Sequence, residues 1–545
     1  MISNSNKVPI KIAGGSEFGL YAKIGAEKTF NMFITKGADG VDWLVNYAGF
    51  QAVTQLIAQG EGRAVYHSVR GDFLIIVVSS TVYRFSMSGA ITIIGLLGTT
   101  TGEVSIDENL ISQVCIVDGT YAYIYNYSGT VTSALTRQTL DYVSPAAGTW
   151  TVTPNYVCYH NSYFLIASNP DTNFPQNWYA AVPGARPPVG PPPPFDGTQI
   201  YIPTDNQFAI QTKPDSAVAI KRIPGAGSNV IIFGETVAEI WTQVPNTIPY
   251  QKIQSSSLDS GCLSINTIAA NEDYICWLAQ NESNAAYIMV LHGNEKLRLS
   301  TDGIDNVLQH LVNPSMSTGF MYSQDGHLFY QLTFYDPADN ITLMYDFNTN
   351  KFFNLSDEKL NYHPARQVVF FNDKSYFVSI NDATLYEMSS KYISYNYSTD
   401  VHAIGKTIPR IRITNTFASP DSARFRVGSF TFRIEQGVNT YHDAVCTCYI
   451  ITEDENYTIT ETSDYIVLED CDCVNEMSAP RVDMSFSKNG NQSFSSVVAR
   501  PLNSEGNYRN QIRWHEMGEA NEFTIQLRFW GLQRFVVSDG ILEVY

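Results

Sequence analysis

Positive charge is scarce in this sequence of 545 residues. Asp and Glu number 53 against 34 Lys and Arg, which gives a formal net charge of −19 at pH 7. The densest basic pair is Lys221-Arg222. Proteins that grip nucleic acid neutralise its phosphates with gathered Lys and Arg side chains. The sequence therefore argues against a protein that holds DNA by charge.

Long apolar runs are missing as well. The longest ones, 73–78 and 91–97, have the length of a β-strand, whereas a transmembrane helix needs about 20 apolar residues. The N-terminus is polar up to Phe18 and shows no secretory leader. We expect a soluble protein that is made in a cytoplasm and does not insert into a membrane.

Catalytic motifs are absent from the sequence. It contains no H-E-x-x-H, no G-x-S-x-G and no phosphate-binding G-x-x-x-x-G-K-[ST], the patterns that place metal ligands, nucleophiles or phosphate-binding amides. We therefore expect no catalytic residue and no cofactor. Because a pair of acidic catalytic residues cannot be placed from sequence alone, a glycosidase stays open as an alternative.

Cysteine is infrequent, with eight residues in the whole chain. The sharpest local pattern is two C-x-C pairs, Cys446 with Cys448 and Cys471 with Cys473. Residues i and i+2 of a strand share a face, so zinc, a cross-strand disulfide and free thiols are all open. Zinc sites usually space their thiols C-x₂₋₄-C, and a cytoplasm keeps thiols reduced. We expect free thiols and no metal.

Seven short segments resemble one another and recur at a nearly constant interval. Each begins with small or polar turn residues and continues with β-branched or aromatic ones. They are GDFLIIVVS (71–79), DGTYAYIYN (118–126), HNSYFLIAS (160–168), GSNVIIFGE (227–235), NEDYICWLA (271–279), DGHLFYQLT (325–333) and NDKSYFVSI (372–380). A period of roughly 40–50 residues built from β-hairpins is typical of propeller blades. The chain is also rich in Tyr and Phe, which favour strands.

These patterns predict an all-β protein, a β-propeller of six or seven blades followed by a C-terminal antiparallel β-sandwich. Residues 1–60 are expected to form a lead-in that docks on the propeller, and 61–400 the propeller itself. The alternating strands after residue 400 place the sandwich at 401–545. A proline-rich insertion at 184–195 leaves the propeller because proline lacks the amide that a strand ladder needs. It is either a rigid exposed loop or a contact arm for a partner.

Three further stretches share residues with one known family. The first, 30–50 with 60–66, contains Asn31, Met32, Gly49, Phe50 and Arg63. The second, 213–244, contains Pro214, Asp215, Gly234, Thr236, Glu239 and Trp241. The third, 484–531, contains Arg513, Trp514 and Gly518. In this order the stretches resemble the tail hub, or nozzle, of short-tailed bacteriophages (podoviruses), the packaged DNA stabilization family. We expect structural roles for these residues.

The resemblance implies a structural virion protein of the phage tail, assembled in the host cytoplasm. It implies a homo-hexameric ring below the portal and its adaptor ring, with a tail needle or plug and tail fibres or spikes as neighbours. Double-stranded DNA would pass through the ring without sequence-specific binding, and the ring would help to retain the packaged genome. Two other functions stay open. One is a propeller glycosidase and the other an adhesin, each acting on glycans of the host surface.

Overall fold

The computed structural model describes residues 6–19, 27–37, 40–128, 134–144, 148–169, 174–187, 195–400, 403, 405–419, 423–436, 480–491, 493–502, 510–531 and 533–545. The chain divides into two compact units. Unit 1 comprises Met1–Gln51, Phe353–Leu360 and Ser389–Tyr545, and unit 2 comprises Ala52–Phe352 and Asn361–Met388. The regular secondary structure of the described residues is almost entirely β-strand, with one α-helix, α1 (Asp302–Gln309), and one 3-10 turn, η1 (Ile265–Thr267). The predicted all-β class is confirmed.

Unit 2 is built from successive antiparallel sheets. The first three contain β6 (Gly62–Ser68), β7 (Phe73–Val78), β8 (Thr81–Ser86) and β9 (Ile91–Leu96); β10 (Ser105–Glu108), β11 (Gln113–Val117), β12 (Ala122–Asn126) and β13 (Thr136–Gln138); and β16 (Pro154–His160), β17 (Tyr163–Ser168), β18 (Asn177–Pro183), β19 (Ile200–Tyr201) and β20 (Gln207–Ala209). A two-stranded sheet of β14 (Asp141–Ser144) and β15 (Gly148–Thr151) precedes the third.

Four more sheets continue the series. They contain β21 (Ala219–Arg222), β22 (Asn229–Phe233), β23 (Ala238–Gln243) and β24 (Tyr250–Leu258); β25 (Gly261–Cys262), β26 (Ala269–Ala270), β27 (Tyr274–Gln280), β28 (Ala286–His292) and β29 (Glu295–Arg298); β30 (Ser317–Gln324), β31 (His327–Phe334), β32 (Ile341–Asp346) and β33 (Lys351–Leu355); and β34 (Ala365–Phe371), β35 (Lys374–Ser379), β36 (Thr384–Ser389) and β5 (Gly49–Gln55).

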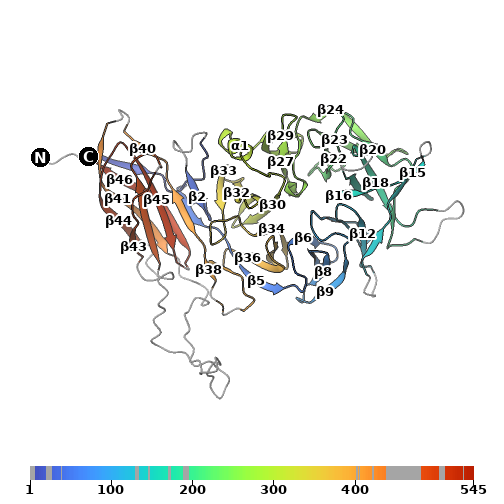
Figure 1. The fold of residues 1–545 in the computed structure, drawn as a ribbon, viewed down its shortest axis with the longest axis horizontal. Coiled ribbons are helices and arrows are strands. Elements are labelled where there is room, and N and C mark those ends of the chain that lie inside the picture. The colour runs from blue at the N-terminus through green and yellow to red at the C-terminus, as the bar shows by residue number, and fades with distance from the viewer. Residues whose placement is uncertain are drawn as a thin grey trace, which may run out of the picture. The chain divides into compact units, whose positions relative to one another are not determined.

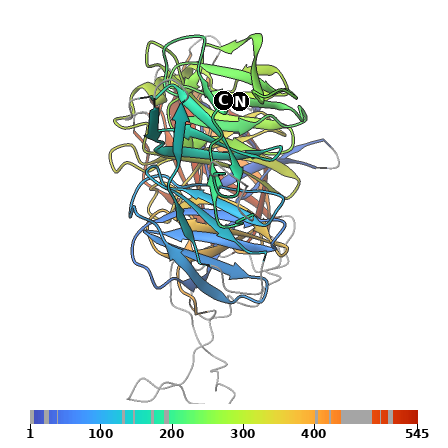
Figure 2. The same cartoon turned by 90° about the vertical axis from the view of Figure 1, so that its right-hand side faces the viewer.

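The seven repeated segments of the sequence fall one into each of these sheets. Six of them form the second strand, as in β7, and the segment at 118–126 forms the third strand, β12. Every side chain of β7 is buried, as expected for a continuous apolar run covered on both faces. Figure 1 shows the sheets of unit 2 following one another around a ring, from blue β6 through green β22 to yellow β34. Figure 2 shows the same antiparallel strands from the side.

Neighbouring sheets of unit 2 pack through shared hydrophobic clusters. One cluster joins Leu74 and Ile76 of the first sheet to Phe371 and Val378 of the last. The last sheet is completed by β5, which precedes the first sheet in the chain and lies next to β36. Leu56 N, just after β5, donates to Ala383 O at 2.8 Å. Strands from the two ends of the unit thus share one sheet, which covers an edge that would otherwise be exposed.

Unit 1 contains two larger antiparallel sheets, whose C-terminal strands are orange and red in Figure 1. One has β3 (Met32–Lys36), β4 (Asp42–Asn46), β46 (Phe535–Val544), β41 (Phe425–Gln436) and β44 (Asn510–Ala520), with β1 (Asn6–Ile10) on β46. The other has β2 (Lys28–Phe30), β39 (Arg410–Ile413), β45 (Glu522–Trp530), β42 (Arg481–Ser487) and β43 (Val498–Pro501), with β40 (Phe417–Ala418) on β45. It has one parallel pair, in which Phe30 of β2 lies opposite Asn354 of β33. Two short strands, β37 (Ser394–Asn396) and β38 (Lys406–Thr407), lie beside the start of β5.

The domain boundaries differ from those predicted. The first residues do not form a separate lead-in on the propeller, because β1 and β4 pair with β46 and β2 pairs with β39. The C-terminal strands are likewise not a separate domain, since N-terminal strands complete their sheets. Each of these N-terminal strands has only three to five residues. Their partners are hundreds of positions away, so no local pattern could reveal the pairing.

The cysteines, the proline-rich insertion and the possible membrane segments were further features of the sequence. Cys115, Cys158, Cys262 and Cys276 are free and buried. The two C-x-C pairs lie outside the described residues, and so does the central part of the proline-rich insertion, 188–194. In the part of the chain that the structure covers, no helix is long and apolar enough to cross a membrane.

Candidate functional site

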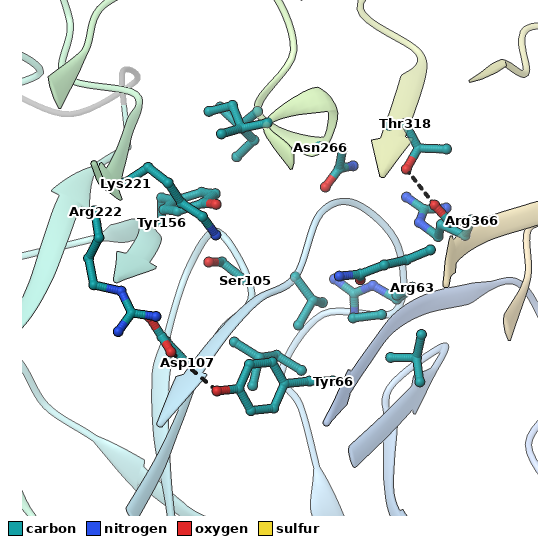
Figure 3. Close-up of a pocket in the computed structure, with 18 residues that line it drawn as sticks. Arg63, Tyr66, Ser105, Asp107, Tyr156, Lys221, Arg222, Asn266, Thr318 and Arg366 are labelled. Carbon is teal, nitrogen blue, oxygen red and sulfur yellow. Dashed lines mark hydrogen bonds between the residues drawn. The ribbon is translucent and has the colours of Figure 1, made fainter. Parts of the chain in front are cut away.

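A cavity of about 220 Å³ lies on the axis of unit 2. Its walls come from every sheet of the ring, because each contributes residues from its innermost segment. These segments are β6, β10, β16, β21, η1, β30 and β34. Figure 3 shows the side chains converging from these separate elements on one space. The ring closure therefore creates the site, since no single sheet could enclose it.

Side chains join the inner strands of neighbouring sheets around this cavity. Asp107 of β10 accepts hydrogen bonds from Tyr159 N in β16 at 2.7 Å and from the Tyr66 hydroxyl in β6 at 3.2 Å. Burial and Asp107 raise the pKa of Tyr66, so its hydroxyl stays protonated and can donate. Thr318 Oγ1 of β30 donates to the carbonyl of Arg366 in β34 at 2.8 Å. Such bonds hold the strands that form the wall.

The cavity is rich in positive charge. Four cationic residues line it, Arg63, Lys221, Arg222 and Arg366, against one carboxylate, Asp107. The strands that carry the four cations belong to three different sheets. Like charges in a space of low dielectric repel one another unless each is compensated, so the partners of each cation decide what the cavity can bind.

Every N–H donor of the Arg63 guanidinium is used by an acceptor of the protein. Its Nε donates to Gly102 O at 2.9 Å, and Nη1 donates to Ser79 O and Thr99 O at 3.0 and 2.9 Å. Its Nη2 donates to Thr99 Oγ1 at 2.9 Å and to Thr101 O at 2.8 Å. Burial lowers the pKa of Arg63, but five acceptors hold the guanidinium in place. The resemblance assigned Arg63 a structural role, and this geometry agrees with one.

The Arg366 guanidinium has fewer hydrogen-bond partners than that of Arg63. It is 3% exposed, and its Nη1 lies 3.6 Å from Glu61 Oε2. No hydrogen-bond partner for Nη1 is present among the described residues. Glu103 also interacts electrostatically with Arg366, but burial raises the pKa of Glu103 to about 7. Glu103 is therefore only partly ionised at neutral pH and compensates the guanidinium incompletely.

Lys221 and Arg222 occupy consecutive positions at the end of β21. The pKa of Lys221 is raised, chiefly by Tyr156, so the ammonium stays charged at neutral pH. Burial is the largest influence on the pKa of Arg222 and would lower it, but Asp107 and several weaker neighbours together outweigh burial, so the net shift is upward. Asn266 of η1 also lines the cavity, and its Nδ2 is buried without a hydrogen-bond partner in the described part of the chain. Donors thus outnumber acceptors in the cavity.

The family-like residues of the central stretch organise the fourth sheet, and none of those six residues lines the cavity. Asp215, which follows Pro214, accepts from Thr236 N at 2.8 Å and Val237 N at 2.9 Å through Oδ2, and from Glu235 N at 3.1 Å through Oδ1. It thereby satisfies the turn between β22 and β23. A side chain at Gly234 would place its Cβ 2.5 Å from Asp215 Oδ2, so glycine at this position allows the carboxylate to approach.

Glu239 is a buried acceptor in the same sheet. Its Oε1 accepts from Gln211 N at 2.9 Å and from Thr212 N at 2.6 Å, and it pairs with Lys252 Nζ at 3.0 Å. Its Oε2 accepts from Trp241 Nε1 at 3.0 Å. Burial would raise the pKa of Glu239, but these donors outweigh it and lower that pKa. Glu239 and Trp241 therefore tie β23 to the preceding loop.

The N-terminal family-like residues form a compact group within unit 1. Asn31 has a positive φ of 54°, and its Nδ2 donates to Ser356 Oγ and Pro409 O at 2.9 Å each. Phe50 stacks on Tyr395 with ring centroids 4.5 Å apart. Gly49 is required beside it, since a Cβ there would lie 2.4 Å from Ser394 O. Met32, which follows Asn31 and is the first residue of β3, is fully buried.

The C-terminal family-like residues all lie on β44. Trp514 is 1% exposed, donates from Nε1 to Val498 O at 3.0 Å and stacks on Phe432. Arg513 is half exposed and pairs with Glu543 Oε2 at 3.1 Å. Gly518 has a φ of +82°, which favours glycine. The structure thus distributes the family-like residues over three separate groups and places only Arg63 at the cavity.

Sequence reasoning missed the cavity, because its cations are dispersed along the chain. A signal was nevertheless present. Arg63, the pair Lys221-Arg222, and Arg366 each stand a few residues before one of the repeated segments, at 71–79, 227–235 and 372–380. In a propeller the strand before such a segment is the inner one, so equivalent positions in different repeats meet at the axis.

Other kinds of site are not indicated by the described residues. Within them, no group of three His, Cys, Asp or Glu side chains is placed to hold a metal ion. Burial raises the pKa of the Cys158 thiol to about 12, which makes it a poor nucleophile at neutral pH. The arrangement on the axis is suited to holding negative charge.

Comparison with known proteins points to bacteriophages. Residues 204–393 match a family model described as "Bacteriophage P22 Gp10, beta-propeller", and this supports a phage structural family for the chain. No curated protein matches. Solved structures with similar propellers include the WD40 domain of Doa1 (10% identity, TM-score 0.37, covering 63% of this chain and 97% of that one). Another is virginiamycin B lyase from Staphylococcus aureus (11%, 0.41, 63% and 99%).

We predict that Gly234→Ala destabilises the fourth sheet. The new methyl group would displace Asp215 from the amides that it caps, at a cost of about 1–3 kcal/mol in the free energy of unfolding. Gly227→Ala is the matched control, since its Cβ would meet nothing within 4 Å. Urea unfolding of both variants is the measurement. Equal stability of the two variants would show that the contact between Gly234 and Asp215 has no energetic importance.

We also predict that stability depends on pH through Glu103. A carboxyl whose pKa is raised by folding binds more protons in the folded state than in the unfolded state. Its contribution to the free energy of unfolding is therefore full below the ordinary pKa near 4.5 and is lost as the pH rises through about 7. Glu103→Gln removes this loss and should stabilise the protein at pH 8 by on the order of 2 kcal/mol, with a smaller effect at pH 5. Urea unfolding at both pH values tests this. The exposed Glu272, changed to Gln, should show no such difference.

Proposed function

We propose that the protein is the tail nozzle, or hub, of a short-tailed bacteriophage. The observation that carries this proposal is the match of residues 204–393 to the phage P22 Gp10 propeller family. The family-like residues of both units support it, because they stand in the expected order along the chain and are engaged in structural contacts. Trp514 packs in an aromatic core, and Asp215 caps a turn.

In this proposal the chain forms a homo-hexameric ring in the virion tail, assembled in the host cytoplasm. The ring lies below the portal and its adaptor ring and contacts the tail needle or plug and the fibres or spikes. Each partner needs its own area of surface. A low content of charged residues, 16% of the chain, is compatible with several interfaces, since Lys, Glu and Asp are depleted where proteins meet.

The same proposal gives the ring a passive role towards DNA. At −19 per chain, a ring of several copies is strongly acidic, and a polyanion moves past an acidic wall without adhering to it. The four cations that the fold gathers face the small axial cavity of the propeller. A duplex cannot enter a space of that volume. Retention of the genome would then rest on a mechanical constriction or plug.

The first test is the assembly state of the purified full-length chain. Negative-stain electron microscopy and mass measurement in solution should show rings of six copies. The rival functions predict something different, since a propeller glycosidase or an adhesin can work as a monomer. A monodisperse monomer that cleaves or binds glycans of the host surface would rule out the nozzle.

The second test concerns DNA. We predict no binding of duplex DNA to the full-length protein at micromolar concentration and low salt, where electrostatic attraction is strongest. Fluorescence anisotropy of a labelled duplex measures this directly. Submicromolar binding that weakens steeply with salt would contradict a passive conduit. If such binding occurs, Lys221→Met separates the axial cavity from other basic surfaces, because binding through the cavity would be reduced in this variant.

A further inference from the structure

The axial cavity carries an excess of positive charge that the rest of the molecule does not explain. The chain as a whole is acidic, with a net charge of −19, yet the cavity is lined by four cations and one carboxylate. Buried charges are costly unless they are paired and hydrogen-bonded. An arrangement of this kind is stable when a further negative charge occupies the space between the cations.

The hydrogen-bond donors of the cavity indicate where such a charge would be held. Arg63 is used by five protein acceptors, and Asp107 is the strongest of several groups whose attraction raises the pKa of Arg222. What remains is Arg366 Nη1, Asn266 Nδ2 and the Lys221 ammonium. The first two are buried and lack a hydrogen-bond partner among the described residues. In Figure 3 Asn266 and Arg366 lie on one side of the cavity and Lys221 on the other, so the donors surround one space.

The carboxylates near Arg366 do not provide a hydrogen-bond acceptor for its Nη1. Glu61 lies 3.6 Å from its Nη1, which is too long for a hydrogen bond, and the Glu61 side chain is 31% exposed. Neither Glu61 nor Glu103 lines the cavity. Since burial raises the pKa of Glu103 to about 7, that carboxyl is partly protonated at neutral pH. Arg366 lines the cavity and its Nη1 has no hydrogen-bond acceptor among the described residues, so it can donate to an acceptor in the cavity.

The volume limits the kind of acceptor. About 220 Å³ equals the share of several water molecules, at about 30 Å³ each in the liquid. Pockets for drug-sized ligands begin at about 300 Å³, so the space between the donors suits a small anion. Guanidinium and ammonium groups are the usual partners of phosphate oxygens. A tetrahedral oxyanion offers acceptors in several directions, which matches donors that come from different sheets.

Arg222 presents an exposed cation at the edge of the cavity. This side chain lines the cavity and also a second hollow of about 730 Å³, together with Gly225 and Gly227 of the turn after β21 and His160 of β16. Arg222 is exposed in the structure. An anion can therefore meet a solvent-accessible cation first and the buried donors afterwards.

We propose that the axial cavity binds one small inorganic oxyanion of the phosphate class, held by Arg366, Asn266 and Lys221. The three donors come from the fourth, fifth and seventh sheets. The anion would therefore cross-link inner segments that only side chains otherwise join. Its effect is to stabilise the closed ring, and it requires neither a tail nor a hexamer.

The experiment uses the full-length protein and inorganic phosphate at millimolar concentration, with ionic strength kept constant by sodium chloride. Titration calorimetry should show saturable binding with one site per chain, and thermal unfolding should shift upwards in parallel. Nitrate is the comparison anion, since it lacks the tetrahedral geometry. Phosphate at high concentration stabilises many proteins by exclusion from their surface, so the saturation is the decisive feature.

Two substitutions of equal charge change make the test specific. Lys221→Met removes a donor of the cavity and should weaken phosphate binding by at least roughly tenfold, as expected for loss of a charge-assisted bond. Lys374→Met is the control, because Lys374 is half exposed and pairs with Glu387 on β36. If Lys221→Met does not fold, Asn266→Ala replaces it. Absence of saturable binding, or equal affinity in the cavity variant and the control, would overturn the proposal.

Discussion

The pairing of β5 with β36 is the interaction on which unit 2 depends. A row of antiparallel sheets has two open ends, and each end exposes an apolar face and an unpaired edge. Here a strand that precedes the first sheet completes the last one, and Leu74 and Phe371 pack in the same cluster. Bringing together positions more than three hundred residues apart costs loop entropy, but that cost grows only slowly with length. Burial of the two terminal faces outweighs it.

Closure has an electrostatic consequence. Inner strands that are far apart in sequence are brought to one axis, and whatever they carry is concentrated there. In this chain they carry Arg63, Lys221, Arg222 and Arg366. An acidic protein thereby acquires a small positive interior. The bonds from Asp107 and Thr318 between neighbouring inner strands hold the wall in place, and the remaining donors make the cavity suitable for an anion.

The family-like residues explain why a structural protein can be recognised through so few positions. Gly234 and Gly49 are needed because another atom occupies the place of a side chain. Asp215 and Glu239 each satisfy several backbone amides that no helix or ladder would satisfy. Asn31 adopts a positive φ while bonding to two distant segments. Such positions tolerate few substitutes, whereas apolar positions of a sheet accept any residue of suitable volume.

The sequence by itself determined the elements of unit 2. The run from Phe73 to Val78 could be nothing but a strand buried on both faces, and the recurrence of such runs predicted a propeller, because a local pattern reflects local burial. The helix that begins after Thr301 is equally local, since its cap and apolar face are adjacent in the chain. These features need no knowledge of distant residues.

Only the tertiary structure decided how distant segments combine. The pairing of β1 and β4 with β46 joined the N-terminal residues to the C-terminal sheets, against the predicted boundaries. The meeting of Arg366 with Lys221 and Asn266 at one cavity was likewise not predicted, because these residues are far apart along the chain and only ring closure brings them together. The periodicity of a strand indicates which of its faces is buried, but it does not indicate which other strand that face packs against. That depends on ring closure, in which all the sheets act together.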